Sequence, residues 1–232
     1  MLVASFSDLV GQRTLITSSH RYMGPAIAEA FRTVGADVVA DERPLVAADA
    51  PQQLIDDVSA GGDIDVLVAN LGVPAVVVPI TEMDDADWLS MYDELVHPLM
   101  RLCRAALPRM IERGRGAIVA VTSSSPLRPI RNASAYASAR AAQNALITSI
   151  GVDVASHGVR VNAIAQNYIA NPTYYPPELT ATERFQTHLA RSVPAGRLGT
   201  PDETAQLALF LASAASGFFA GRIIPLDGGW SA

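Results

Sequence analysis

The sequence predicts an α/β fold in which a doubly wound parallel sheet is flanked by helices on both faces. Most segments with strand character are near-continuous apolar runs, which are typical of strands buried on both faces of a sheet. Helical patterns alternate with these runs, and that alternation favours parallel strands joined by crossover helices. Ligands of such sheets bind beyond the carboxyl ends of the strands, so the loops after the strands are the places to search for function.

Each strand is predicted from a short apolar run. The predicted strands are 13–17, 37–41, 64–70, 116–123, 160–165 and 222–227. Between 41 and 64 the chain has room for only one short extended piece and one helix. A full unit of helix, strand and helix does not fit in that segment.

The helices are predicted from apolar residues that recur at helical spacing. They cover 25–35, 85–113, 134–158 and 201–213. Gly35 and Gly158 end the first and the third of these helices, as expected for a glycine that follows the last helical turn.

The composition favours one soluble domain, 1–232, with a small-molecule ligand. Half of the residues are hydrophobic, 17% are charged, and no apolar stretch reaches the length of a membrane span. With 17 basic and 23 acidic residues, the chain lacks the basic surface that binds nucleic acids. The single Cys103 allows no internal disulfide, and the first residues do not resemble a secretory signal, so a cytoplasmic location is expected. Four scattered His predict no metal site.

Three side chains able to carry out acid–base chemistry are expected to converge. Ser123 ends a predicted strand, and Tyr136 and Arg140 lie four residues apart on one face of the following helix. A phenol with a pKa of about 10 is a poor base at neutral pH, but a nearby guanidinium favours the phenolate. Tyr136 could then take a proton from a substrate hydroxyl that Ser123 holds. The alternative is an exposed Tyr–Arg pair with Ser123 in an ordinary turn.

The spacing of Ser123, Tyr136 and a basic residue four positions on resembles the short-chain dehydrogenase/reductase superfamily. The resemblance extends over nearly the whole chain. The stretch ANLG (69–72) stands at the superfamily's NNAG turn, RVNAIA (160–165) matches its sixth strand, and 210–230 is similar to its closing helix and strand. The resemblance implies a Rossmann-like fold, in which a glycine-rich turn holds the pyrophosphate of a dinucleotide.

Three departures from the superfamily's pattern indicate that this chain uses no cofactor. Ser18 and Tyr22 replace two glycines of the TGxxxGxG turn and leave only Gly24, so a ring would occupy phosphate space. Arg140 replaces the lysine that contacts the nicotinamide ribose. The sequence Gln166-Asn167-Tyr168 (166–168) replaces the Pro-Gly that borders the nicotinamide.

The spacing Thr17-x4-Tyr22-x-Gly24 resembles the T-x4-[F/Y]-x-G pattern of the halohydrin dehalogenases, and the stretch NYIANPTYYPPE (167–178) is most similar to their B-type members. That family converts vicinal haloalcohols to epoxides and releases halide and a proton without a redox cofactor. The resemblance also implies the reverse reaction, in which halide, azide, cyanide or nitrite opens an epoxide.

Carried onto this chain, the resemblance assigns a role to each site residue. Tyr136 deprotonates the hydroxyl, Ser123 binds the same oxygen and Arg140 lowers the pKa of Tyr136. The predicted halide site consists of Tyr22, Gln166, Asn167 and Tyr168. The candidate walls of the substrate pocket are Leu127, Pro129, Ile130, Tyr174 and Tyr175, which core packing or an interface would explain almost as well. A homotetramer is expected by analogy with the superfamily.

Two other functions stay open at this stage. The first is a divergent NAD(P)-dependent oxidoreductase, for which Asp41 at the end of the second strand could hold an adenosine ribose. An acid after that strand can equally be a solvated loop residue. The second is a catalytically silent binding module that kept the fold. Trp230 is compatible with a pocket wall or with an interface and receives no role.

Overall fold

A computed structural model describes residues 6–232 and confirms the predicted α/β class. Its sheet has six parallel strands in the order β2-β1-β3-β4-β5-β6. The strands are β1 (Arg13–Ile16), β2 (Asp37–Ala40), β3 (Val66–Asn70), β4 (Gly116–Ser123), β5 (Val159–Gln166) and β6 (Ile223–Leu226). The strand order reverses between β1 and β3, so a ligand site is expected beyond the carboxyl ends of these two strands.

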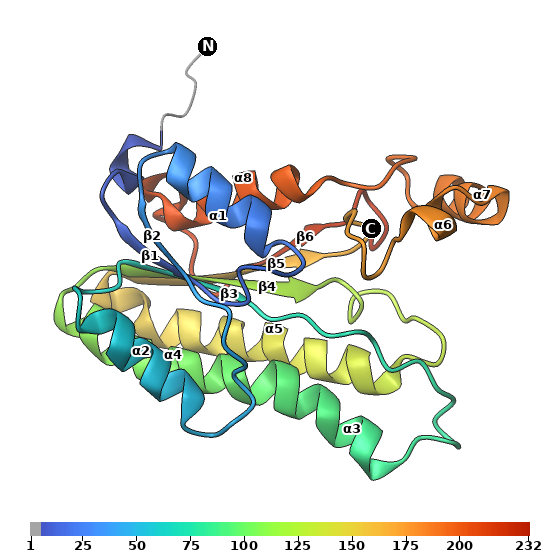
Figure 1. The fold of residues 1–232 in the computed structure, drawn as a ribbon, viewed down its shortest axis with the longest axis horizontal. Coiled ribbons are helices and arrows are strands. Elements are labelled where there is room, and N and C mark those ends of the chain that lie inside the picture. Colours follow the sequence, from blue (N-terminus) through green and yellow to red (C-terminus); the bar gives the residue numbers. More distant parts are fainter. Residues whose placement is uncertain (1–5) are drawn as a thin grey trace.

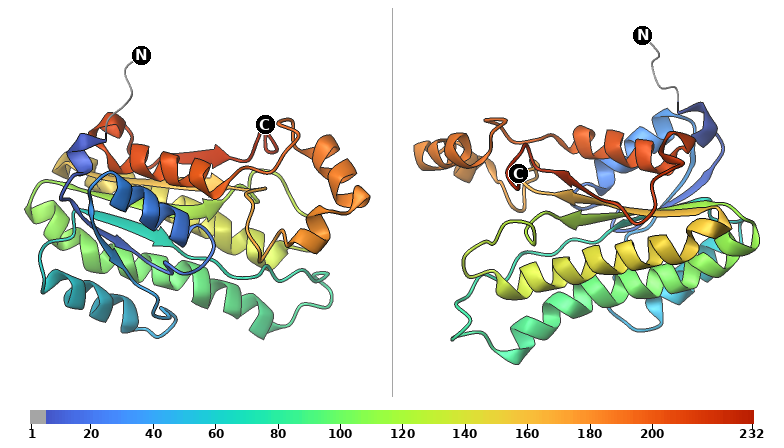
Figure 2. Two further views of the ribbon diagram at one scale, coloured as in Figure 1. Left: turned by 45° about the horizontal axis from the view of Figure 1, so that its top comes forward. Right: turned by 180° about the vertical axis from the view of Figure 1, so that it is seen from behind.

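Helices cover both faces of the sheet (Figure 1). On one face α1 (Gly24–Thr33) packs against α8 (Pro201–Ala212). The other face carries α2 (Ala50–Ser59), α3 (Asp85–Met91), α4 (His97–Glu112) and α5 (Ser134–Val154). Views from two further directions show α4 and α5 lying side by side beneath the sheet (Figure 2).

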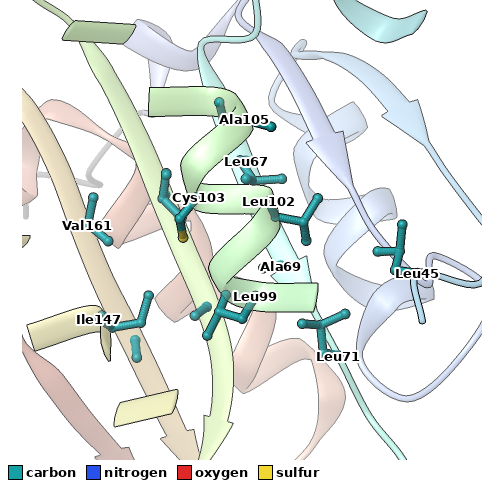
Figure 3. Packing of buried hydrophobic residues seen from close by; sticks show 14 of the residues in the cluster. Leu45, Leu67, Ala69, Leu71, Leu99, Leu102, Cys103, Ala105, Ile147 and Val161 are labelled. Atoms are coloured by element: carbon teal, nitrogen blue, oxygen red, sulfur yellow. The ribbon is translucent and has the colours of Figure 1, made fainter. Parts of the chain in front are cut away.

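A hydrophobic core fills the space between the sheet and each helical layer. On the α4 and α5 side, Leu99, Leu102 and Cys103 of α4 pack with Leu67 of β3 and Ile147 of α5 (Figure 3). All five of these side chains are fully buried. The burial explains why the strands read as continuous apolar runs, because helices cover both of their faces.

The register of β4 and β5 brings two predicted site residues together. Ser123 and Gln166 are Cα partners at the carboxyl ends of these strands. The same edge carries Asn70, which ends β3 and pairs with Val121 of β4. The loops after β3, β4 and β5 therefore begin next to one another.

The predicted helix 85–113 is interrupted in the structure by a π-helical segment, Tyr92–Val96. The backbone N–H of His97 bonds to the carbonyl of Tyr92, five residues back. Pro98 follows at once and has no N–H to continue the α-helical pattern. π-Helical turns inside α-helices occur frequently at functional sites.

The crossover from β2 to β3 is as short as predicted, since it contains the single helix α2 and no strand. Two helices were not predicted. They are α6 (Pro177–Thr180) and α7 (Glu183–Ser192), and they lie beyond the carboxyl edge of the sheet (Figure 1). Within residues 6–232, no helix is both long and apolar enough to cross a membrane. The homotetramer stays a prediction.

Candidate active site

The structure brings Ser123, Tyr136 and Arg140 together around a cavity of about 170 Å³. Ser123 comes from the end of β4, and the other two from successive turns at the start of α5. All three are buried, and Tyr136 is 9% exposed. The Ser123 Oγ accepts a hydrogen bond of 3.0 Å from the backbone N–H of Ser125, which fixes its position.

Arg140 is a buried cation without an anionic partner among the described residues. Its guanidinium donates to the carbonyl of Leu71 at 3.1 Å, the carbonyl of Val121 at 3.4 Å and the Oε1 of Gln143 at 2.9 Å. The Cζ atom lies 5.1 Å from the centre of the Tyr136 ring. A buried charge is costly unless something compensates it, so the site favours a negative group beside Arg140.

Tyr136 is that negative group when it ionises. Burial raises the pKa of its phenol, but the charge of Arg140 and hydrogen bonds with Tyr174, Arg140 and Ser123 lower it. The balance places the pKa of Tyr136 below the ordinary value for tyrosine. The geometry therefore supports a phenolate that can act as a base.

Tyr174 joins this group from the loop after β5. Its hydroxyl donates to the carbonyl of Val73 and also contacts Tyr136. Burial, followed by the nearby Tyr136, raises the pKa of Tyr174. Tyr174 thus stays protonated while Tyr136 ionises, and its single hydroxyl proton has both the Val73 carbonyl and the Tyr136 oxygen as acceptors within reach. Its ring centre lies 5.8 Å from that of Tyr22.

The ring of Tyr22 occupies the switch point between β1 and β3. A Cβ atom on Gly72, in the loop after β3, would come within 2.4 Å of this ring, so the ring lies directly against the Gly72 backbone. Asn70 holds the loop by donating from Nδ2 to the carbonyls of Ser18 and Arg21, each at 3.0 Å. In this conformation the residues do not fit a dinucleotide, because the ring fills the gap that its pyrophosphate would cross.

Asp41 is engaged within the chain. Its carboxylate accepts from the backbone N–H of Arg43 at 3.0 Å and from the Arg43 Nε at 2.8 Å. The side chain of Asp41 is 12% exposed. Each Asp41 oxygen thus already accepts one hydrogen bond from Arg43, and a ribose would have to share this carboxylate with Arg43.

The loop after β5 offers one backbone donor to the cavity. The N–H of Tyr168 bonds to Asn167 Oδ1 at 2.9 Å, so Asn167 fixes this loop, while Gln166 Oε1 accepts from Thr204 of α8 at 3.1 Å. Among the described residues, the N–H of Ile169 has no acceptor, and Ile169 lines the cavity. Sequence reasoning missed Ile169, because a backbone group has no side-chain signature.

The predicted aromatic and apolar wall residues divide into those at the cavity and those away from it. Tyr22, Tyr168, Tyr174, Tyr175 and Ile130 line it. Leu127 and Pro129 do not line it and are exposed, with Leu127 at 49%. Trp230 packs behind the loop, where its ring centre lies 5.9 Å from that of Tyr168. Residues 6–232 contain no group of three or more His, Cys, Asp or Glu that could hold a metal ion.

A family model described as enoyl-(acyl carrier protein) reductase matches residues 46–231. The chain belongs to the short-chain dehydrogenase/reductase superfamily. Among its relatives, galactitol 2-dehydrogenase of Rhizobium johnstonii is 34% identical over 96% of this chain and 96% of its own length. Other relatives are also named as dehydrogenases or reductases.

Two solved structures that are described as dehalogenases are also similar to this chain. A structure described as a dehalogenation enzyme has a TM-score of 0.89 and 31% identity, covering 96% of this chain and 99% of its own. A halohydrin dehalogenase bound to ethyl (2S)-oxiran-2-ylacetate has a TM-score of 0.88 and 26% identity, covering 94% and 96%. These similarities establish the superfamily. They do not distinguish the activity of the relatives named as dehydrogenases or reductases from that of the structures named as dehalogenases.

Replacing Tyr174 with Phe is expected to slow any reaction of this superfamily site that uses Tyr136 as its base. The variant removes a hydrogen bond that lowers the pKa of Tyr136, so that pKa rises and the rate–pH profile moves to higher pH. A decrease of about threefold to tenfold at neutral pH corresponds to the loss of one such bond. The measurement is the rate of turnover against pH. An unchanged profile would assign Tyr174 to the pocket wall alone.

Proposed function

We propose that the protein is a halohydrin dehalogenase, which converts vicinal haloalcohols to epoxides without a nicotinamide cofactor. The observation that carries the proposal is the ring of Tyr22 against Gly72, at the point where a dinucleotide would cross the sheet edge. The unpaired cation of Arg140 next to the phenol supports it further.

The proposed reaction begins with the substrate hydroxyl between Ser123 and Tyr136. The Tyr136 phenolate takes the hydroxyl proton, and the alkoxide oxygen attacks the neighbouring carbon from the side opposite the halogen. The new C–O bond closes the epoxide while the C–X bond breaks, and its electron pair leaves with the halide. Tyr136 then returns its proton to solvent. The protein supplies deprotonation, alignment and a place for the anion.

We assign the halide to the side of the cavity that Tyr22 and the loop after β5 enclose. The free N–H of Ile169 can donate to an anion there, and the positive edges of aromatic rings suit a large, weakly basic ion. Asn167 and Gln166 act in this proposal by holding the loop, since their side-chain oxygens already accept from Tyr168 and Thr204. Tyr168 contributes its ring, while its own N–H is engaged with Asn167.

The size of the cavity indicates short substrates. A volume of about 170 Å³ lies below the roughly 300–1,000 Å³ of pockets that enclose drug-sized ligands. Haloalcohols with a few carbon atoms fit this proposal better than long-chain or bulky ones. Incubation with a brominated or chlorinated propanol in weak buffer, with halide and acid release followed in the absence of nucleotide, tests the activity.

The second candidate is an NAD(P)-dependent oxidoreductase, which the names of the sequence relatives favour over the dehalogenase. The loop geometry opposes it, because Tyr22 fills the gap and Arg43 engages Asp41. For this candidate, we expect the protein to oxidise an alcohol or to reduce a carbonyl compound when a nucleotide is present. We expect no halide release.

Titrating NADH and NADPH into the purified protein is expected to give no saturable binding at micromolar concentration. The physical reason is that the Tyr22 ring would have to leave Gly72 before a pyrophosphate could enter. Nucleotide fluorescence or calorimetry measures the binding, with a dehydrogenase of the same superfamily as the positive control. Micromolar binding of either nucleotide would favour the oxidoreductase.

A further inference from the structure

A buried amide connects the π-helical segment to the active-site cation. Gln143 lies on α5, one turn after Arg140, and is 1% exposed. Its Nε2 donates to the carbonyl of Leu95 at 2.7 Å, and its Oε1 accepts from Arg140 at 2.9 Å. Leu95 belongs to the π-helical segment Tyr92–Val96. Two elements of the fold, α5 and the π-helical segment, therefore meet at one side chain.

The chemistry of both neighbours requires a group that donates on one side and accepts on the other. A carbonyl oxygen only accepts and a guanidinium only donates, so a single orientation of the Gln143 amide satisfies both. Glutamate could accept from Arg140 but, when ionised, could not donate to Leu95. Methionine has a similar shape and could serve neither partner well.

The bond from Gln143 reaches the π-helical segment shortly before Pro98. Pro98 has no N–H, so the carbonyl of Glu94, four residues back, lacks its α-helical donor. Gln143 supplies a side-chain donor to the carbonyl of Leu95 in that turn. A carbonyl of the π-helical segment therefore accepts a hydrogen bond from Gln143 across the helix interface, and Gln143 also accepts one from Arg140.

We infer that Gln143 is a positioning residue, which anchors Arg140 to the π-helical segment as a neutral acceptor and leaves its positive charge available to Tyr136. A carboxylate at this position would compensate the same charge and withdraw it from the phenol. The neutral amide holds the guanidinium in place without cancelling it. The carbonyls of Leu71 and Val121, which are also neutral, hold the guanidinium in the same way.

The surroundings of Tyr136 define what a titration would measure. The charged and titratable groups that act on it are Arg140 on α5 and Tyr174 in the loop after β5. Tyr22 and Tyr175 are also close enough to interact with it, and Glu94 on the π-helical segment acts on Tyr22. Burial raises the pKa of Tyr22, Tyr174 and Tyr175, so these phenols ionise after Tyr136 as the pH is raised.

The test is an ultraviolet titration of the Tyr136 phenolate in the full-length protein. Subtracting the curve of Tyr136→Phe from that of the parent isolates Tyr136 among the six tyrosines. Gln143→Glu is expected to raise the pKa of Tyr136 by about one unit or more, because the new carboxylate pairs with Arg140. The curve subtracted from that of Gln143→Glu is the curve of the double variant Gln143→Glu with Tyr136→Phe.

Gln186→Glu is the matched control. Gln186 is an exposed residue of α7 that does not line the cavity, so this variant makes the same change of net charge in solvent and is expected to leave the titration unchanged. Gln143→Met keeps the volume and removes both hydrogen bonds. It is expected to lower kcat about tenfold with little change in KM, since Arg140 is no longer held at its distance from Tyr136.

The outcomes separate this inference from its alternatives. The inference is wrong if folded Gln143→Glu titrates Tyr136 as the parent does. It is also wrong if Gln143→Met keeps both the kcat and the Tyr136 titration of the parent. A lower melting temperature with an unmoved titration means that Gln143 only packs the helix interface. The rate readout rests on the proposed function, but the titration does not: if the parent releases no halide, that proposal fails and the titration still decides the role of Gln143.

Discussion

Tyr136→Phe is expected to abolish halide release from a vicinal haloalcohol. The variant keeps the ring and removes the only group in the cavity that is buried against a cation and also has a lowered pKa. General-base catalysis contributes roughly 10²–10⁴-fold, so any residual rate of Tyr136→Phe is expected to be at least about a hundredfold below that of the parent. Acid and halide release in weak buffer measure the effect.

Tyr92→Phe is the matched control for this change. Tyr92 packs against Trp88, with ring centres 5.3 Å apart, and does not line the cavity. The control is expected to keep the parental rate. A folded Tyr136→Phe protein with the parental rate would refute the phenolate mechanism, and circular dichroism with thermal unfolding would establish that the variant is folded.

Arg140→Met is expected to reduce the rate at neutral pH about a hundredfold and to shift the rate–pH profile upward. Burial raises the pKa of Tyr136, and the Arg140 charge is the largest effect that opposes it. Without that charge, the pKa of Tyr136 rises, and each unit of increase lowers the phenolate fraction about tenfold at a pH below both values. The loss is therefore expected to shrink as the pH is raised.

Arg140→Lys separates the charge from the shape of the side chain. An ammonium keeps the positive charge, but lysine has a shorter head group than the guanidinium whose Nη1 donates to Leu71, Val121 and Gln143, so the charge takes a different position relative to Tyr136. We expect its profile to lie between those of the parent and Arg140→Met. If the pH profile of Arg140→Met equals that of the parent, Arg140 does not control the pKa of Tyr136.

The parts of the fold that the sequence predicted are those in which burial and periodicity agree. The run 117–121 of β4 is buried at every position, and such continuous apolar runs are recognisable without a structure. Helix α7 was missed because only Phe185 and Leu189 of its ten residues are buried, so its apolar pattern is sparse. The π-helical segment was missed because a shift to bonds spanning five residues leaves no periodic signature within five residues.

The site was predictable where side chains carry the chemistry. The loops after β1, β4 and β5 lie at the same edge of a parallel sheet, so Tyr22, Ser123 and Gln166 could be grouped from the sequence. The contributions of Ile169 and Gln143 depend on which hydrogen bonds are already taken, which spacing does not reveal. A signal for Gln143 did exist, since a polar residue three positions after Arg140 lies on the same helix face.

Residues 6–232 contain four non-glycine residues with a positive φ angle, and three of them, Ser18, Tyr22 and Tyr168, belong to the loops that carry the two aromatic walls of the cavity. Each left-handed residue of this kind costs about 1 kcal/mol of stability that glycine would not. Glycine at Tyr22 or Tyr168 would relieve that backbone cost, but it would also remove a ring that packs against Gly72 or Trp230. The strained backbone is therefore tied to the aromatic rings that, in the proposed function, enclose the anion.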